Sequence, residues 1–292
     1  RGLGDVYKRQ LSTTVRSEDC PSKMVDGFLE EKKVNSYSDP DDIPEELLKD
    51  LSPSQLSYSE LKVLGQRELD PLEDLLKHGK ILNKPPYEEL EGTNSVYVLE
   101  FEGGVKGIWK PHKEDYYSNY RTEVLSYEVD RALKLGLVPV TIERRIGDEV
   151  GSIQLFKNSA NPESIPESEL NKQYFFDFLI DNRDRGYTNF LLSEDGKIIS
   201  IDNGMSFTGK GYQGRGFMFV RKMLKSFIHT DEGQAVITEL RKLDLDAFAN
   251  EIRPYIGSKD TKKFMRRIKL VLKLSKRIYL KGKKKKFKKI ES

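Results

Sequence analysis

Two stretches in the first half of the chain alternate apolar and polar positions with a period of two residues. The first pairs 95–101 with 105–110 across a turn at 102–104, and the second pairs 139–145 with 150–156 across Gly147-Asp148. Alternation interrupted by glycine-containing turns is typical of antiparallel hairpins. We therefore expect an antiparallel sheet in this half of the chain.

Helical patterns flank these hairpins. Apolar residues recur at helical spacing in 44–77, 115–135, 169–180, 216–229, 234–243, 245–252 and 259–280. Asp70 followed by Pro71 has the pattern of an N-cap and a first-turn proline, and Gly136 favours a stop after the second helix. A sheet followed by helices predicts an α+β protein with two lobes, which a Pro-containing connector near 161–166 separates.

A third, shorter hairpin carries the densest chemistry in the chain. The apolar runs 190–192 and 198–201 surround a turn at 193–196, and Asn189 precedes the hairpin while Asp202 follows it. Because paired strands bring their two open ends together, Asn189 and Asp202 can share one Mg²⁺ through an amide oxygen and a carboxylate. Asp184 and Asn189 also have the D-x-x-x-x-N spacing of a kinase catalytic loop. A surface hairpin beside an Asp-rich loop remains the alternative.

Lys110 ends an apolar strand and is followed by Pro111, which stops the strand. An inward lysine at this place can bridge nucleotide phosphates, although a solvated strand end is the alternative. We predict that it pairs with Glu123, which precedes the most apolar part of the helix 115–135, where an unpaired carboxylate is costly. Glu128 is the competing partner, and it points in a different direction.

Two further segments are candidate nucleotide contacts. Thr93, Asn94 and Ser95 lie just before the first hairpin, where small polar residues can cap phosphate oxygens, but the segment contains a single glycine and an ordinary turn is also compatible. Gln154, Leu155 and Phe156 end the second hairpin. We expect this triplet to line a hinge, where main-chain groups meet adenine and apolar side chains enclose it.

Composition narrows the class of protein. With 292 residues and 37% hydrophobic content, the chain can bury a sizeable core. One cysteine and three scattered histidines exclude an intramolecular disulfide framework, a cysteine cage and zinc spacing. Because the chain has no run of about 20 apolar residues, we expect no membrane span. We expect a cytoplasmic protein, and one hypothesis places it peripherally at an anionic membrane surface.

Charge is distributed unevenly. Residues 257–292 contain sixteen Lys or Arg against two acids, a net +14, so the remainder carries −11 of the total +3. A basic amphipathic helix with a polybasic end can bind an anionic membrane or another polyanion, and a packed helix with a solvated tail is the alternative. The chain shows no specific nucleic-acid motif, and its oligomeric state is not predicted.

These patterns divide the chain into five parts. Residues 5–10, DVYKRQ, correspond to one translated frame of a common sequencing-library transposon end, and we interpret residues 1–10 as an assembly artefact. We expect an N-terminal arm and helical extension over 11–85, an N-lobe over 86–160, a C-lobe over 161–280 and a polybasic tail over 281–292.

Several longer motifs resemble one family. They are GIWKP at 107–111, YRTEVLSYEVDRALKLGLVP at 120–139, GSIQLF at 151–156, DNRDRGYTN at 181–189 and IDNGMSF at 201–207. The chain resembles the atypical kinases that group with phosphatidylinositol 3- and 4-kinases, the Golgi casein kinases and their bacterial relatives.

The resemblance implies a two-lobed protein-kinase-like fold with ATP and Mg²⁺ or Mn²⁺ as cofactors. In that reading Lys110 binds phosphates and pairs with Glu123, Asp184 is the catalytic carboxylate, and Asn189 and Asp202 hold the metal. Gly186 departs from the family, because many members have a histidine there.

The expected activity is phosphoryl transfer from ATP to protein Ser or Thr hydroxyls. A phosphoinositide kinase at an anionic membrane, an AMP-transferring enzyme on the same fold and a nucleotide-binding pseudokinase remain alternatives. Gly186 and the glycine-poor segment before the first hairpin favour the pseudokinase.

Overall fold

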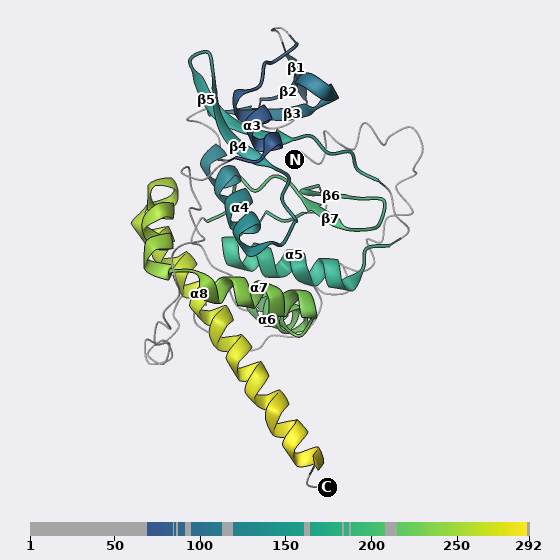
Figure 1. The fold of residues 1–292 in the computed structure, drawn as a ribbon, viewed down its shortest axis with the longest axis vertical. Coiled ribbons are helices and arrows are strands. Elements are labelled where there is room, and N and C mark those ends of the chain that lie inside the picture. The colour runs from purple at the N-terminus through teal and green to yellow at the C-terminus, as the bar shows by residue number, and fades with distance from the viewer. Residues whose placement is uncertain are drawn as a thin grey trace.

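The structure is a computed structural model that describes residues 69–83, 85, 87–90, 95–112, 119–160, 164–182, 184–186, 188–207 and 215–290, with the side chains of 215–219 and 279–290 excepted. It has an upper part built on a sheet and a lower part built from helices (Figure 1). The predicted two-lobed α+β arrangement is therefore confirmed.

The upper part contains a five-stranded antiparallel sheet in the order β1-β2-β3-β5-β4. Its strands are β1 (Glu88–Leu90), β2 (Val96–Glu100), β3 (Lys106–Pro111), β4 (Thr141–Ile146) and β5 (Glu149–Leu155). Both predicted hairpins are present, and a short 3₁₀ turn (Glu102–Gly104) joins β2 to β3. The pattern did not indicate β1, a three-residue strand that pairs with β2.

The lower part consists of α5 (Glu167–Ile180), the hairpin of β6 (Phe190–Leu192) and β7 (Ile198–Ser200), α6 (Arg215–Ile228), α7 (Asp231–Lys242) and α8 (Leu245–Ile290). The helix α8 contains a break at Gly257, which has a φ of 77°, so the two predicted helices 245–252 and 259–280 are separated as expected. The second one continues to Ile290, and Figure 1 shows it projecting away from the body.

Capping side chains move two helix starts from their predicted places. The helix α4 (Tyr120–Leu133) begins after Asn119, whose side chain accepts a hydrogen bond from Arg121 N, and not at Asp115. It ends at Leu133, and the C-cap residue Lys134 is left-handed (φ 55°), so Gly136 is not the stop. Similarly, Thr230 caps α7, which begins at Asp231, three residues before the predicted start at Gln234.

The helix α3 (Pro71–His78) is the described part of the N-terminal extension. Asp70 caps it, as the sequence predicts, and the structure adds a reciprocal bond from the Asp70 N–H to the Glu73 carboxylate. Leu76 is fully buried in a cluster with Trp109 and Ile153, which lie on the sheet. This helix of the predicted extension therefore packs on the sheet, and the predicted helical segment before residue 69 lies outside the described residues.

A second apolar cluster joins the two parts of the molecule. Val96, Val98 and Ile108 from β2 and β3 pack against Leu191 of β6 and against Ile201. The β6–β7 hairpin is thus held against the sheet, and Asp202, which follows β7, accepts a hydrogen bond from Lys110 near the end of β3. No helix of the described residues is both long and apolar enough to cross a membrane.

Candidate active site

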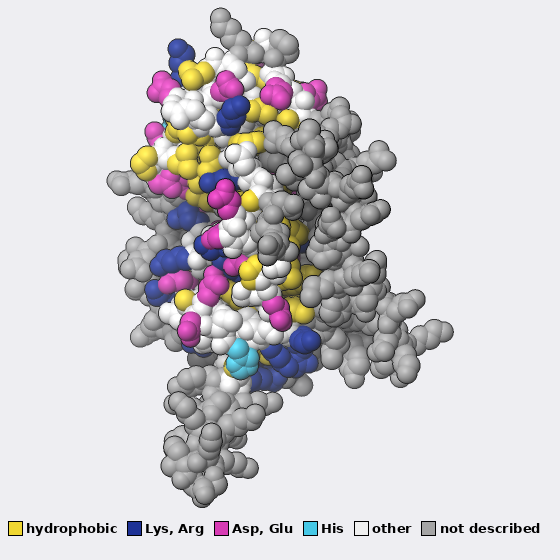
Figure 2. Space-filling model, turned by 90° about the vertical axis from the view of Figure 1, so that its right-hand side faces the viewer, with side chains coloured by type: hydrophobic (Ala, Val, Ile, Leu, Met, Phe, Trp, Pro, Cys, Tyr) yellow, Lys and Arg dark blue, Asp and Glu magenta, His cyan; other side chains and the backbone are white. Residues whose placement is uncertain are grey.

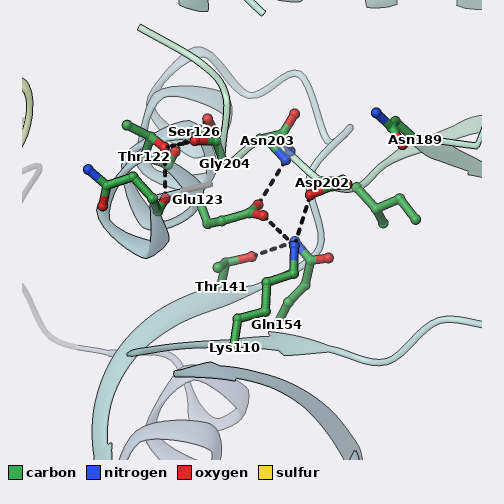
Figure 3. A network of polar contacts seen from close by, with 12 residues as sticks. Lys110, Thr122, Glu123, Ser126, Thr141, Gln154, Asn189, Asp202, Asn203 and Gly204 are labelled. Atoms are coloured by element: carbon green, nitrogen blue, oxygen red, sulfur yellow. Dashed lines mark hydrogen bonds and ion pairs between the residues drawn. The ribbon is translucent and has the colours of Figure 1, made fainter. Parts of the chain in front are cut away.

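Lys110 lies at the centre of a buried polar cluster between the two lobes (Figure 3). It sits on β3 opposite Ser152 of β5, and its ammonium group donates to Glu123 Oε1 and to Asp202 Oδ1, the latter at 3.2 Å. Burial opposes the positive charge, but the carboxylates of Asp202 and Glu123 outweigh it and raise the pKa of Lys110. Lys110 therefore stays charged, and it is not a solvated strand end.

The predicted choice of Glu123 over Glu128 is confirmed. The Glu123 carboxylate is 1% exposed, and its second oxygen accepts the Asn203 N–H at 2.9 Å. Glu128 instead accepts from Arg131 on the same helix, at 2.9 and 3.1 Å. The two oxygens of Glu123 thus connect β3 to the turn that follows Asp202.

The start of α4 is bonded to the same turn. The carbonyl of Gly204 accepts from Asn119 N at 3.0 Å and from the Thr122 hydroxyl at 2.8 Å. Together with the bond between Asn203 and Glu123, these contacts fasten the 202–204 turn to the first turn of α4 (Figure 3).

Asp184 and Asn189 are close neighbours in the loop between α5 and β6. The Asn189 amide nitrogen donates to the Asp184 backbone carbonyl and, at 3.1 Å, to Asp184 Oδ2. Asn182 Oδ1 accepts from Asp184 N at 3.0 Å, which fixes the backbone of the loop. Asp184 is exposed, so its carboxylate is accessible to a bound hydroxyl group.

The short hairpin brings Asn189 and Asp202 to one end, as predicted. Phe190 pairs with Ser200, and Ile201 N donates to the Asn189 carbonyl at 3.2 Å, which continues the ladder by one step. Asp202 then takes a left-handed conformation with a φ of 54°. Such a conformation is uncommon for a residue other than glycine and is enriched at functional sites.

The oxygen atoms of these two residues suit a hard divalent cation. Because the Asn189 nitrogen is engaged by Asp184, its amide oxygen lies on the other side, where it accepts from the Thr188 hydroxyl at 3.2 Å. In the described part of the chain no group of three or more His, Cys, Asp or Glu could hold a metal. One carboxylate and one amide could hold a Mg²⁺ whose other ligands would be water and phosphate oxygens, because this ion takes oxygen ligands and usually keeps several waters.

The predicted nucleotide contacts are only partly described. Thr93 and Asn94 lie outside the described residues, and Ser95 directly precedes β2. The N–H groups of Leu155 and Phe156 already donate to Val140 and Lys106 carbonyls at 2.8 and 2.9 Å. These two residues can therefore offer apolar surface to a base more readily than a free N–H.

The side chain of Gln154 also points inward, donating to the Thr141 hydroxyl at 2.9 Å beside Lys110.

Sequence reasoning missed Arg185, whose guanidinium group bonds to Asp177 on α5 and to the Asn203 side chain, at 3.0 and 2.6 Å. A sequence feature of α5 could have indicated the need for such a partner. Asp177 stands between Phe176 and Phe178, and a carboxylate in such an apolar segment requires a cationic or donor partner.

Comparisons with known proteins give a likeness of fold. Neither a protein-family model nor a curated protein matches the chain. The Golgi casein kinase with Mn/ADP bound is 14% identical over 69% of this chain and 74% of its own, with a TM-score of 0.42. A hydra Fam20 with sugar is 15% identical (67% and 85%, TM-score 0.41), and the Helicobacter pylori proinflammatory kinase CtkA is 12% identical (70% and 98%, TM-score 0.44). At these identities and scores, no residue role or activity carries over to this chain.

Proposed function

We propose that the chain is an ATP-dependent phosphotransferase that phosphorylates Ser or Thr hydroxyls of a protein, with Mg²⁺ or Mn²⁺ as cofactor. The observation that carries the proposal is the contact of one buried lysine with two carboxylates, Glu123 and Asp202, beside the pair formed by Asp184 and Asn189. A cation, two metal-competent oxygen donors and an exposed carboxylate are the components that phosphoryl transfer requires.

Each residue has a role that follows from its contacts. Lys110 is held in place by Glu123, and it can exchange its bond with Asp202 for phosphate oxygens. Asp202 and Asn189 would hold the cation, which neutralises charge on the transferred phosphoryl group. Asp184, exposed and fixed by its loop, is placed to orient the acceptor hydroxyl and accept its proton.

The acceptor is proposed from the resemblance in the motifs and not from surface charge. On the face in Figure 2, hydrophobic side chains gather toward the upper part of the molecule with acidic side chains around them, and acidic and basic side chains are mixed farther down. The described part of this face has no single sign of charge that would select an acceptor, so a protein hydroxyl is proposed from the resemblance in the motifs.

The basic C-terminal segment supports a separate proposal about a partner. Residues 257–292 carry a net +14, and the backbone of α8 continues as a helix to Ile290. We propose that this segment attracts an anionic membrane surface and holds the protein peripherally, since each basic residue near such a surface contributes about 1 kcal/mol.

The experiment uses residues 11–292, incubated with Mg²⁺ and ATP and a mixture of candidate proteins, with a phosphoinositide in a parallel sample. Label transferred from the γ-position and absent in Asp184→Asn supports the proposal. Label from the α-position identifies AMP transfer, and label only in the lipid identifies a phosphoinositide kinase. Nucleotide binding without transfer identifies a pseudokinase.

A further inference from the structure

One guanidinium group connects the segments that carry the proposed metal ligands. The Arg185 side chain is 8% exposed, and its Nε and Nη2 atoms donate to the Asp177 carboxylate at 3.0–3.1 Å. Nη2 also donates to Asn203 Oδ1 at 2.6 Å. Nη1 donates to two backbone carbonyls, those of Asn189 and, at 2.7 Å, Ile201.

The two carbonyls belong to the two sides of the proposed metal site. Asn189 is itself one predicted ligand residue, and Ile201 immediately precedes the other, Asp202. Because one nitrogen bonds both carbonyls, the separation of the two strands at this end depends on the placement of Arg185. The rigid, planar fork of a guanidinium group can make these contacts together with a paired carboxylate, and a lysine ammonium group cannot.

Two side chains fix the guanidinium in turn. Asp177 is 1% exposed on α5, where burial raises its pKa and Arg185 opposes that effect. Asn203 is fully buried, and its amide oxygen also lies 3.3 Å from both Asn182 Nδ2 and Ser200 Oγ. Asn203, the residue after Asp202, thus provides a side-chain oxygen that accepts from the Arg185 guanidinium group.

We propose that Arg185 is a positioning residue that sets the distance between Asn189 and Asp202 and so determines the affinity for the divalent cation. The proposal rests on the proposed function of the site. It assigns no contact between Arg185 and the substrate or the cation, since the guanidinium group bonds Asp177, Asn203 and the carbonyls of Asn189 and Ile201.

The test compares Arg185→Lys with Arg144→Lys. Arg144 is a matched control, since its guanidinium group also bonds two backbone carbonyls, those of Leu76 and Gly79, both at 2.8 Å and both on the far side of the sheet from Asp202. The Mg²⁺ concentration for half-maximal turnover is measured at saturating ATP. Substitution of residues that orient metal ligands commonly costs about 10–100-fold in metal affinity, and we expect a rise in that range for Arg185→Lys alone.

A second measurement needs neither metal nor nucleotide. Amide hydrogen exchange of Ile201 and Asn203 is followed in the ligand-free protein, where we expect it to be at least about tenfold faster in Arg185→Lys and unchanged in Arg144→Lys. Guanidinium ion added at millimolar concentration to Arg185→Gly should partly restore the Mg²⁺ dependence, which a general loss of stability would not allow.

The outcomes distinguish a failure of the proposed phosphotransferase function from a failure of the proposed positioning role of Arg185. A wild-type protein that neither binds nor uses Mg²⁺ and ATP overturns the proposed function, whereas the exchange measurement still reports on Arg185. Unchanged exchange in Arg185→Lys overturns the positioning role. An equal shift in metal dependence for both lysine variants also overturns it, because the effect would then follow from lost stability.

Discussion

Glu123→Gln tests the centre of the site, because it removes one charge and keeps the shape of the side chain. Glu123 accepts from two donors, Lys110 Nζ and Asn203 N–H. A glutamine has one acceptor oxygen and one donor group, so one of the two donors would face an amide NH₂. Which donor is affected depends on the rotamer, but one hydrogen bond is lost in either case.

The size of the effect follows from the burial of the pair. A buried donor left without an acceptor costs about 1–3 kcal/mol. Since about 1.4 kcal/mol corresponds to a tenfold change in rate, kcat/KM should fall by about 5–150-fold if the whole cost is felt in the transition state. Lys110 keeps its contact with Asp202 in the ligand-free protein, so we expect the variant to fold while its turnover falls.

Glu128→Gln is the matched control on the same helix. It removes an ion pair with Arg131, a side chain that is 32% exposed, and such pairs contribute about 0–1 kcal/mol. We expect a change in turnover below about fivefold.

Both variants are assayed for γ-phosphoryl transfer, with thermal unfolding in the absence of nucleotide as a check on folding. A Glu128→Gln effect equal to that of Glu123→Gln, at matched stability, would refute the assignment of the pair.

Three further predictions concern other parts of the chain. Burial raises the pKa of Asp130 to about 7 in the folded state, so between about pH 4 and about pH 7 the folded protein binds a proton at Asp130 that the unfolded chain has released. The free energy of unfolding should therefore decrease as the pH rises through this range. In urea unfolding, Asp130→Asn should show a weaker dependence of that free energy on pH. Among the described residues, a Cβ at Gly186 would meet only Thr188 Oγ1, at 3.8 Å. Gly186→His should therefore fold with an unchanged Tm, and it should raise kcat if the missing imidazole limits transfer. Deletion of residues 281–292 should abolish sedimentation with acidic vesicles and leave the affinity for ATP intact. In the intact protein, binding to these vesicles should weaken as added salt shortens the Debye length from about 10 Å to about 3 Å. Loss of ATP binding on truncation would contradict a separate role for the tail.

Local patterns were sufficient for the main elements and for one side-chain pair. The hairpins could be predicted because alternation and glycine turns act within a few residues. Glu123 could be chosen over Glu128 because only the first begins the most apolar part of α4, and burial of both it and Lys110 follows from their flanking residues.

Other features depend on distant residues and could not be predicted in this way. The strand β1 forms because β2 offers it an edge, since its three residues carry no strong pattern of their own. The contacts of Arg185 require α5, the loop before β6 and the residues after β7 to meet in space. Even the starts of α4 and α7 depend on capping contacts that shift a boundary by several residues.

The bonds between the start of α4 and the 202–204 turn also determine how the protein populates its conformations. Separation of the two segments would break the bonds from Asn119 and Thr122 to Gly204 and the bond from Asn203 to Glu123. At about 1 kcal/mol each, these contacts keep a separated conformer below about 1% of the molecules. A small molecule that binds only that conformer would therefore have an apparent affinity about 100-fold weaker than its intrinsic one, whereas a ligand of the joined conformer would bind without that loss.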